Sequence, residues 1–389
     1  YSIQSLLNSA GVTQAIESGR FLKHIQAAFA QKGAVSGQLG QDVWQAAQGA
    51  EAIIYKNTVI GGYVYSIAET LGIPCAEASF LPVTRTREFP PLILGKDRGP
   101  LLNWLLGQLI DQGIEQVIWQ FSRREVNRQR RDLLERSPLP FFGPSAQKHR
   151  AGMPIFYAYS PLVLPRPADW PDRIHVPGYW VLDSPSGWQP PAELLQFLEH
   201  GPAPVYIGFG SMPSQNSEAM LEMILQALQL AGQRGILLSG WAGIGKGRVL
   251  PEGVLSVENI PHEWLFPRMA ALVHHGGAGT TGAALRSGVP SIVTPFFADQ
   301  PFWAWRVHTL GVGSAPLPHK TLTAQQLANA INEAVTNTTM RKRAAEIGRC
   351  LQAEDGLGRT IEIFLQYVDR RGSMRKAFFD REPHRSSID

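Results

Sequence analysis

Cysteine is scarce in this sequence, and no two cysteines form a motif. Only Cys75 and Cys350 occur among the 389 residues, and neither belongs to a CxxC pair. This argues against a disulfide framework and against a zinc site built on cysteine. We therefore expect a cytoplasmic protein.

Long apolar runs and a strong charge of either sign are also missing. The longest apolar stretch, residues 101–110, is too short to cross a bilayer. The net charge is +4 at pH 7, without a module of aromatic and basic residues, so nucleic-acid binding is not expected. We interpret the basic segment at 123–131 as a solvated helix face, with peripheral contact at a membrane surface as the alternative.

The start of the chain lacks the features of a secretory signal. It opens at Tyr1 with neither a basic segment nor a long apolar run. Because the first residue is not Met either, we expect that a further N-terminal piece precedes it.

What is present is an ordinary globular composition, 44% hydrophobic and 17% charged, long enough for about two domains. Short apolar runs alternate with helical patterns, which predicts an α/β fold with doubly wound parallel sheets. Strands are expected at 52–55, 73–80, 174–181, 204–209, 235–239, 254–260, 270–274 and 291–294. Helices are expected at 41–50, 61–71, 100–134, 217–230, 280–287 and 323–335, with the last helices ending near Arg370.

The most informative segment is the glycine-rich block from Val273 to Gly282, which follows a strand and opens a helix. Glycines let backbone amides approach a phosphate closely, and a helix N-terminus adds partial positive charge. Thr280 adds a hydroxyl donor, and His275 could donate to a diphosphate oxygen. The alternative is a glycine-rich turn without a ligand, but two histidines at the end of one strand favour phosphate binding.

Two further strand ends carry polar residues. Ser211 follows the glycine turn at 208–210, where it could bond a phosphate. Asp299 and Gln300 precede an expected helix that begins near Pro301, and they could bond sugar hydroxyls. Helix capping by Asp299 explains that pair about equally well. No Walker loop is present, so an ATPase is not indicated.

These segments resemble glycosyltransferase family 1, and most closely the sterol 3-beta-glucosyltransferases and their bacterial relatives that glycosylate antibiotics. The resemblance lies in residues 258–266, 274–281 and 296–302, and also in 78–84, 87–90 and 180–185. It implies the GT-B fold, in which two Rossmann-like doubly wound domains face each other across a cleft. It implies an acceptor-binding domain at 1–165 that lacks its first strand–turn–helix unit, a linker at 166–191, a nucleotide-sugar domain at 192–366 and a basic tail at 367–389.

The resemblance also implies roles for individual residues. The diphosphate would be held by Ser211, His275, Gly277, Ala278, Gly279 and Thr280. Ile260 and His262 would border the uracil and ribose together with Trp241, although a tryptophan is more often core packing. Asp299 and Gln300 would hold the glucose hydroxyls, and the acceptor would lie near Phe80, Thr84 and Phe89 and the apolar stretch 101–110.

The reaction implied is inverting transfer of glucose from UDP-glucose, a co-substrate, to a hydroxyl of a sterol or other apolar acceptor, with no cofactor and no metal ion. The family's base lies in an N-terminal glycine-rich loop that this sequence does not contain, so we name no catalytic base. The alternatives are a UDP-sugar-binding protein without turnover, a glycosyltransferase of macrolide-type natural products, and a sugar-nucleotide epimerase.

Overall fold

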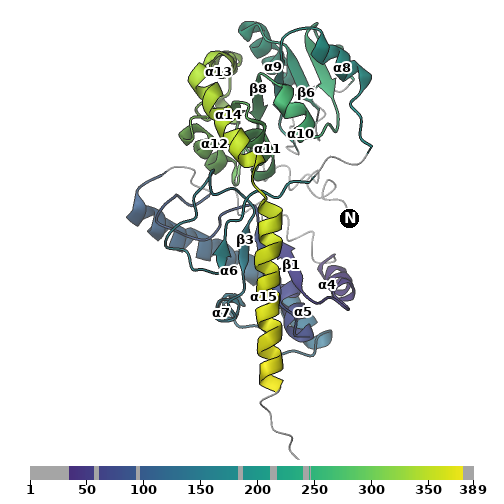
Figure 1. Ribbon diagram of the computed structural model, residues 1–389, viewed down its shortest axis with the longest axis vertical. Helices are drawn as coiled ribbons and strands as arrows, with labels where there is room; N and C mark the ends of the chain where they lie inside the picture. The colour runs from purple at the N-terminus through teal and green to yellow at the C-terminus, as the bar shows by residue number, and fades with distance from the viewer. Residues whose placement is uncertain are drawn as a thin grey trace, which may run out of the picture.

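A computed structural model describes residues 35–56, 61–92, 97–182, 187–210, 217–239, 245 and 247–379. Each half of the chain builds one sheet, and we call the regions around these sheets the N-terminal lobe and the C-terminal lobe. Figure 1 shows the two lobes stacked along the long axis of the molecule, with α15 running from the upper lobe down along the lower one. The fold is thus α/β with two separate sheets, as the sequence predicts.

The N-terminal lobe contains four parallel strands in the order β1–β2–β3–β4. Its core gathers aromatic side chains of β1, α5 and α6, among them Tyr55, Tyr63 and Trp119. The elements of this lobe are α4 (Val35–Ala46), β1 (Ile53–Lys56), α5 (Gly61–Leu71), β2 (Cys75–Ser79), α6 (Pro100–Asp132), α7 (Ser145–Arg150), β3 (Ile155–Tyr157) and β4 (Ile174–His175).

The C-terminal lobe contains five parallel strands in the order β7–β6–β5–β8–β9. This is a doubly wound order: successive strands are added on one side of β5 up to β7 and then on its other side from β8, so the strand order reverses between β5 and β8. Its elements are α8 (Ala192–Glu199), β5 (Val205–Gly208), α9 (Ser217–Ala231), β6 (Gly235–Leu238), β7 (Val254–Val257), α10 (His262–Leu265), η1 (Phe266–Arg268), β8 (Ala271–His274), α11 (Ala278–Ser287), β9 (Ser291–Val293), α12 (Gln300–Thr309), η2 (His319–Thr321), α13 (Ala324–Thr336), α14 (Thr338–Gln352) and α15 (Gly356–Phe379).

Helices cover both faces of the C-terminal sheet. One core packs α9 and α13 against β5 and β8 through residues such as Ile224, Ile331 and Val273. The opposite core packs α8, α10 and α11 against the same strands through Leu194, Leu265 and Tyr206. Because the strands are buried on both sides, they appear in the sequence as short continuous apolar runs.

The region between the lobes departs from the sequence prediction. The expected strand at 174–181 is only β4, Ile174–His175, and it completes the N-terminal sheet by pairing with β3. Helix α15 continues to Phe379, so the prediction that the last helices end near Arg370 is wrong. The predicted boundary at residue 366 lies inside this helix, and the division into domains stays a prediction.

The cysteines and the membrane prediction can be compared with the described residues. Cys75 is buried and Cys350 is exposed, and both are free thiols. Within the described ranges, no helix combines the length and the apolar character needed to cross a bilayer.

Candidate functional site

The carboxyl ends of β5 and β8 lie side by side at the reversal point of the C-terminal sheet. β5 pairs with β8 in parallel, with Gly208 opposite His274. Ligands of doubly wound sheets bind in the crevice outside the strands at this point. The two glycine turns found in the sequence therefore meet where such a fold binds its ligand.

The ring of His275 lies between these two turns. A Cβ atom on Gly210 would stand 2.9 Å from its Cε1, and one on Gly277 would stand 2.5 Å from its Nε2. Both positions therefore need glycine for the ring to fit. Burial lowers the pKa of His275 to about 4, and among the described residues its Nδ1 has no hydrogen-bond partner. A neutral imidazole is thus held at the crevice with one nitrogen unused.

The first turn of α11 supplies backbone amides. Those of Gly277, Gly279 and Thr280 donate to no other residue in the described ranges, as expected at a helix N-terminus. The other two amides of the expected cradle are already used. Gly276 donates to His274 Nδ1 at 3.1 Å, and Ala278 donates to Asp299 Oδ2 at 3.2 Å. The Ala278 amide is thus bonded to Asp299, and the predicted role of Ala278 in holding the diphosphate stays a prediction.

Asp299 occupies the N-cap position of α12, but its side chain makes no capping bond there. It reaches across to α11 instead, through the bond to Ala278. Burial raises the pKa of its carboxyl, and hydrogen bonds from backbone amides act against that rise. The carboxylate thus lies at the mouth of the glycine turn, beside the positive end of α11.

Gln300 has a structural role. Its side chain is 3% exposed, and its Oε1 accepts hydrogen bonds from the amides of Phe296 at 2.7 Å and Phe297 at 3.2 Å. This oxygen thus closes the turn between β9 and α12, and the predicted contact of Gln300 with glucose hydroxyls stays a prediction.

Of the residues predicted to border the uracil and ribose, His262 and Ile260 lie next to the same crevice. His262 begins α10, stacks on Phe266 with ring centroids 4.3 Å apart, and has its Nε2 3.5 Å from the Tyr206 hydroxyl. Burial lowers its pKa to about 4. Ile260 is a buried core residue. Ser211 and Trp241 lie outside the described residues, so their predicted roles stay predictions.

His274 is a further candidate in the same motif. It is completely buried, and its Nδ1 accepts the Gly276 amide, so its proton is on Nε2. Within the described part of the chain, that Nε2 has no hydrogen-bond partner. Burial keeps the ring neutral by lowering its pKa to about 3. A buried donor without an acceptor is costly, so this nitrogen is suited to a ligand oxygen.

Lys56 ends β1 of the other sheet and is exposed. Its positive charge lowers the pKa of Asp299, against the larger effect of burial. Such an effect requires the two side chains to be near each other. The carboxyl end of the N-terminal sheet therefore faces the Asp299 turn of the C-terminal lobe.

The residues predicted to contact the acceptor have different surroundings. Phe80, at the end of β2, is 39% exposed and meets Trp180 edge-on at 6.2 Å. Thr84 is half-buried, with its Oγ1 2.6 Å from the hydroxyl of Tyr157. Phe89 is only 5% exposed and packs against α12, so this packing does not support its predicted contact with an acceptor.

Comparison with known proteins shows which proteins this chain is similar to. The family described as "Erythromycin biosynthesis protein CIII-like, C-terminal domain" matches residues 243–355. A sterol 3-beta-glucosyltransferase of Arabidopsis thaliana is 39% identical over 319 residues, which are 82% of this chain and 49% of that protein. The chain is thus similar to these glycosyltransferases and shares the GT-B fold. It spans about half the length of this relative.

Solved structures agree on the fold. The glycosyltransferase of kitacinnamycin superposes with a TM-score of 0.63 at 19% identity, over 88% of this chain and 82% of that one. The glycosyltransferase VinC in complex with dTDP gives a TM-score of 0.55 at 18% identity, over 94% and 86% of the two chains. The GT-B fold and the resemblance to sterol 3-beta-glucosyltransferases are thus confirmed.

Sequence reasoning predicted the two glycine turns at strand ends that the sheet places side by side, but it did not single out His274 or Lys56. His274 is adjacent to the chosen His275, and alternation along β8 could have indicated that the two rings point in different directions. Nothing in the sequence around Lys56 pointed to Asp299, because the electrostatic effect of Lys56 on this carboxyl depends on how the lobes face each other. No group of three or more potential metal ligands is found among the described residues.

Proposed function

We propose that the complete protein transfers glucose from UDP-glucose to a hydroxyl group of a sterol or another apolar acceptor, with inversion at the anomeric carbon. The observation that carries this proposal is the His275 ring held between two glycine turns at the reversal point of the C-terminal sheet. The similarity of the chain to the Arabidopsis relative supports the same proposed function, since that relative is named a sterol 3-beta-glucosyltransferase.

The diphosphate would bind at the start of α11. The amides of Gly277, Gly279 and Thr280 are oriented by the helix, and its macrodipole favours an anion there. His274 and His275 are neutral, so each can donate one hydrogen bond without adding charge. Backbone dipoles and neutral imidazoles would therefore stabilise the negative charge that develops on the leaving UDP.

The sugar would lie between Asp299 and the N-terminal lobe. One oxygen of the Asp299 carboxylate accepts the Ala278 amide, and a carboxylate has room for further donors such as sugar hydroxyls. A base would take the proton of the acceptor hydroxyl, the oxygen would attack the anomeric carbon, and the bond to UDP would break. We assign no residue as that base.

The acceptor would enter from the N-terminal lobe, near Phe80. This ring is partly exposed at the end of β2 and borders Trp180, and Lys56 lies over its face at 5.6 Å from the centroid. A ring in this position offers an apolar contact close to the Asp299 side of the cleft. The family match to an erythromycin biosynthesis protein keeps a macrolide-type natural product as the alternative acceptor.

The test is product formation from UDP-glucose with sterols, flavonoids and macrolides, detected by mass spectrometry. We expect a glucosylated sterol from the wild-type protein and at least about 100-fold less from His275→Ala, because a donor to the leaving group is lost. Circular dichroism should show an unchanged fold. Wild-type turnover by His275→Ala would remove the assigned role of His275.

A donor-binding assay distinguishes the proposed transfer from the alternative function, UDP-sugar binding without turnover. Binding of UDP-glucose with neither product nor free UDP from any acceptor would support the alternative function and contradict the transfer proposal. The measurement therefore needs calorimetric binding and product detection on the same sample.

A further inference from the structure

One side of α6 carries large apolar side chains that no part of the donor site uses. Leu101, Leu105 and Leu109 follow each other at four-residue spacing, and Leu101 and Leu109 are 70% and 72% exposed. Four-residue spacing keeps side chains on neighbouring turns of one helix side. From Leu101 to Leu109 this side, which we call the α6 face, is about 12 Å long.

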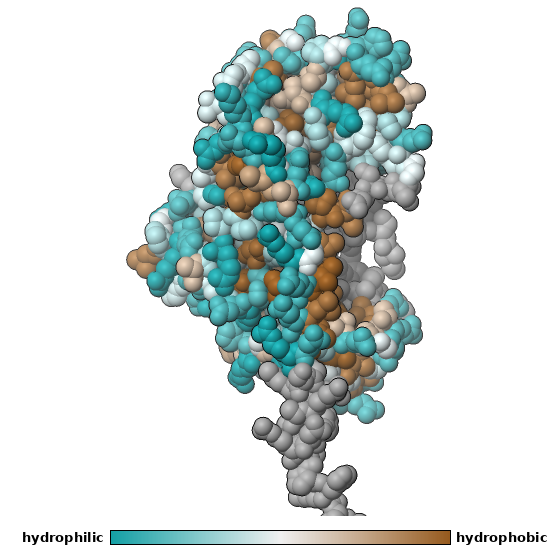
Figure 2. Space-filling model, in the orientation of Figure 1, coloured by the Kyte–Doolittle hydropathy of each residue, from teal (hydrophilic) through white to brown (hydrophobic). Residues whose placement is uncertain are grey.

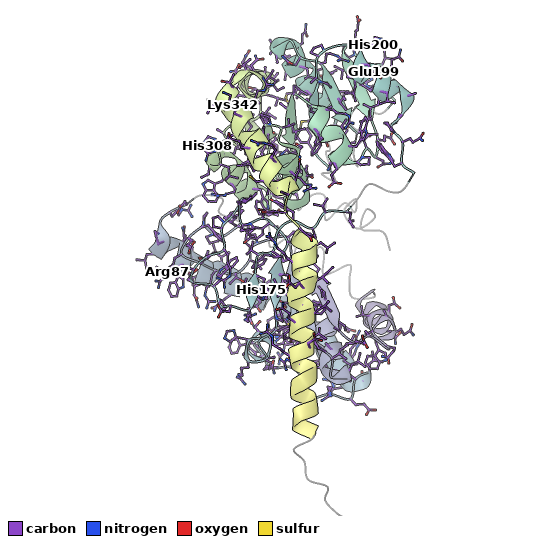
Figure 3. All side chains as sticks on the ribbon, viewed as in Figure 1. Arg87, His175, Glu199, His200, His308 and Lys342 are labelled. Atoms are coloured by element: carbon purple, nitrogen blue, oxygen red, sulfur yellow. The ribbon has the colours of Figure 1, made fainter. Side chains whose placement is uncertain are left out.

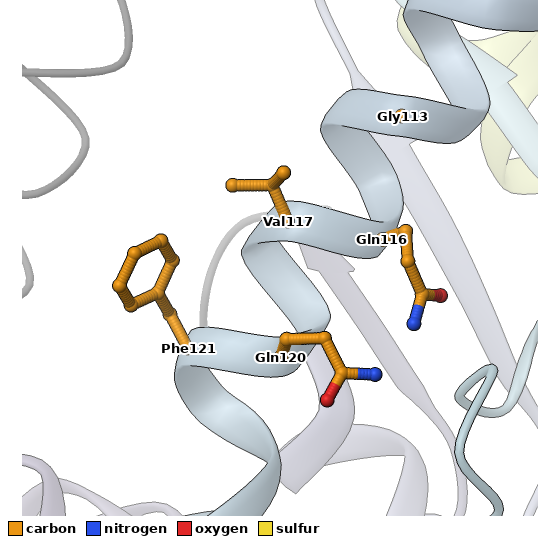
Figure 4. A pocket seen from close by; sticks show the side chains of 5 residues that line it. All are labelled: Gly113, Gln116, Val117, Gln120 and Phe121. Atoms are coloured by element: carbon orange, nitrogen blue, oxygen red, sulfur yellow. The ribbon is translucent and has the colours of Figure 1, made fainter.

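A hollow lies beyond the α6 face, on the second half of the helix, where the same spacing has turned farther around the helix axis. Figure 4 shows its lining, with Val117 and Phe121 on one side and two glutamines on the other. Gly113 contributes no side chain, so the surface dips at that turn. The lining is neutral, which suits contact with an apolar phase and offers no charge to a water-exposed partner.

An aromatic turn packs against α6 next to this hollow. Phe141 and Phe142 are 53% and 77% exposed, and their rings meet edge-on at 5.2 Å. The Phe141 carbonyl accepts hydrogen bonds from Trp119 Nε1 and Gln120 Nε2, each at 2.8 Å. The turn is thus anchored to α6, with two phenyl rings presented to the exterior.

Basic side chains follow on the last turns of α6. The guanidinium of Arg123 lies 5.2 Å from the centre of the Phe141 ring, and Arg124 and Arg131 are exposed. Arg128 is exposed as well, paired with Glu125 at 2.6 Å. Aromatic rings beside arginines match the boundary between acyl chains and anionic headgroups, where each part has a favourable partner.

We propose that the α6 face and the Phe141–Phe142 turn dock this protein on a lipid bilayer with anionic headgroups. The leucines and phenyl rings enter the outer acyl region, and the arginines meet the headgroups. Figure 2 shows hydrophobic surface at the left-hand tip of the molecule, where α6 begins in Figure 1. The docking surface is separate from the glycine turns, so its test does not depend on the proposed transfer reaction.

The test is co-sedimentation of the purified protein with vesicles of phosphatidylcholine alone or with one quarter phosphatidylserine. We expect binding to the anionic vesicles that weakens with salt. Leu109→Glu with Phe142→Glu should lower this binding at least about tenfold, because burying each apolar side chain favours the bound state. Leu230→Glu is the matched control, since Leu230 is 49% exposed on α9 of the other lobe.

A second pair of variants tests the charge contribution. Arg124→Glu with Arg131→Glu should remove the preference for anionic vesicles, because the headgroup attraction is reversed. Arg341→Glu with Lys342→Glu makes the same charge change on α14, where Figure 3 labels Lys342, and should keep that preference. Circular dichroism of every variant shows whether the fold is retained.

Three outcomes would overturn the proposal. One is equal binding of the wild-type protein and the Leu109→Glu, Phe142→Glu variant, and another is no preference between the two lipid mixtures. The third is a dimer that forms without vesicles and is dispersed by Leu109→Glu, because the α6 face would then be covered by a second copy of the chain.

Discussion

At the residue scale, the site depends on histidines that stay uncharged. His262, His274 and His275 have pKa values of about 4, 3 and 4, in each case mainly because burial disfavours the imidazolium form. At neutral pH each ring is therefore a hydrogen-bonding group without net charge. The positive potential at the crevice comes from the start of α11 and not from these side chains.

The depressed pKa values predict how stability depends on pH. The unfolded chain protonates each histidine near pH 6.5, whereas the folded chain resists protonation down to about pH 4 for His275 and His262. The unfolded state binds more protons in this window, so the free energy of unfolding falls as the pH drops, by about 1.4 kcal/mol per pH unit for each histidine.

Denaturant unfolding of His262→Phe between pH 6.5 and 4 measures this effect. The variant keeps an aromatic ring next to Phe266 but cannot be protonated. We expect the free energy of unfolding of the variant to change less steeply with pH than that of the wild type. The difference in slope should be about 1.4 kcal/mol per pH unit, the contribution of one histidine. Identical slopes would show that His262 is not held neutral.

Asp299 combines a structural bond with a predicted sugar contact, and two substitutions separate them. Asp299→Ala leaves the Ala278 amide without its acceptor, which should lower the free energy of unfolding by about 1 kcal/mol. Asp299→Asn keeps an oxygen that can accept this amide, so its stability should match the wild type. We expect both variants to lose glucose transfer in the product assay. Full transfer by Asp299→Asn would rule out a need for the carboxylate charge.

At the element scale, the site is made by two strand-to-helix turns whose backbones approach a ring. Gly210 has φ of 61°, a left-handed conformation that glycine adopts readily. A Cβ atom there would also lie 2.9 Å from His275 Cε1. Glycine at this position therefore allows the left-handed turn and also leaves room for the His275 ring.

Gly210→Ala should weaken UDP binding at least about tenfold, because the new methyl group displaces His275, which would donate to the diphosphate. Gly232→Ala is the control, since Gly232 has the same φ of 61° but no atom within 4 Å of an added Cβ. Both variants should lose about 1 kcal/mol of stability from the strained backbone. Calorimetry with UDP distinguishes them, and equal affinity of the two would contradict the placement of the ring.

The same scale shows what the sequence could predict. The strands predicted at 52–55 and 204–209 correspond to β1 and β5, and the helix predicted at 61–71 is α5, because apolar runs and glycine stops are local signals. β3 was missed, and β4 was predicted as part of a linker, because strands of two or three residues carry little periodicity. The closure of a turn by Gln300 could not be predicted, since it depends on where the chain folds back.

At the scale of the whole molecule, the lobes share a core of aromatic side chains. Phe89 and Trp170 of the N-terminal half pack against Phe302 of α12, with Phe89 5.8 Å from Phe302 between ring centroids. Tyr159 meets Trp303 at 6.0 Å in the same core. The relative position of the two sheets therefore depends on this packing as well as on the connecting chain.

Phe302→Ala should destabilise both lobes, by about 3–5 kcal/mol, because its completely buried ring leaves a cavity between them. Amide hydrogen exchange in β3 and in β9 should both become faster. Phe266→Ala, an equally buried ring within the C-terminal lobe, is the control and should leave β3 unchanged. Exchange that changes only in β9 would show that the shared core does not couple the lobes.

The central claim is that the start of α11 and the neighbouring imidazoles bind a pyrophosphate, and a crystal structure of the complex with UDP tests it most directly. We predict phosphate oxygens within hydrogen-bond distance of the Gly277, Gly279 and Thr280 amides and of His275, with Ala278 still bonded to Asp299. A UDP molecule bound elsewhere, or phosphates that contact none of these groups, would contradict the account.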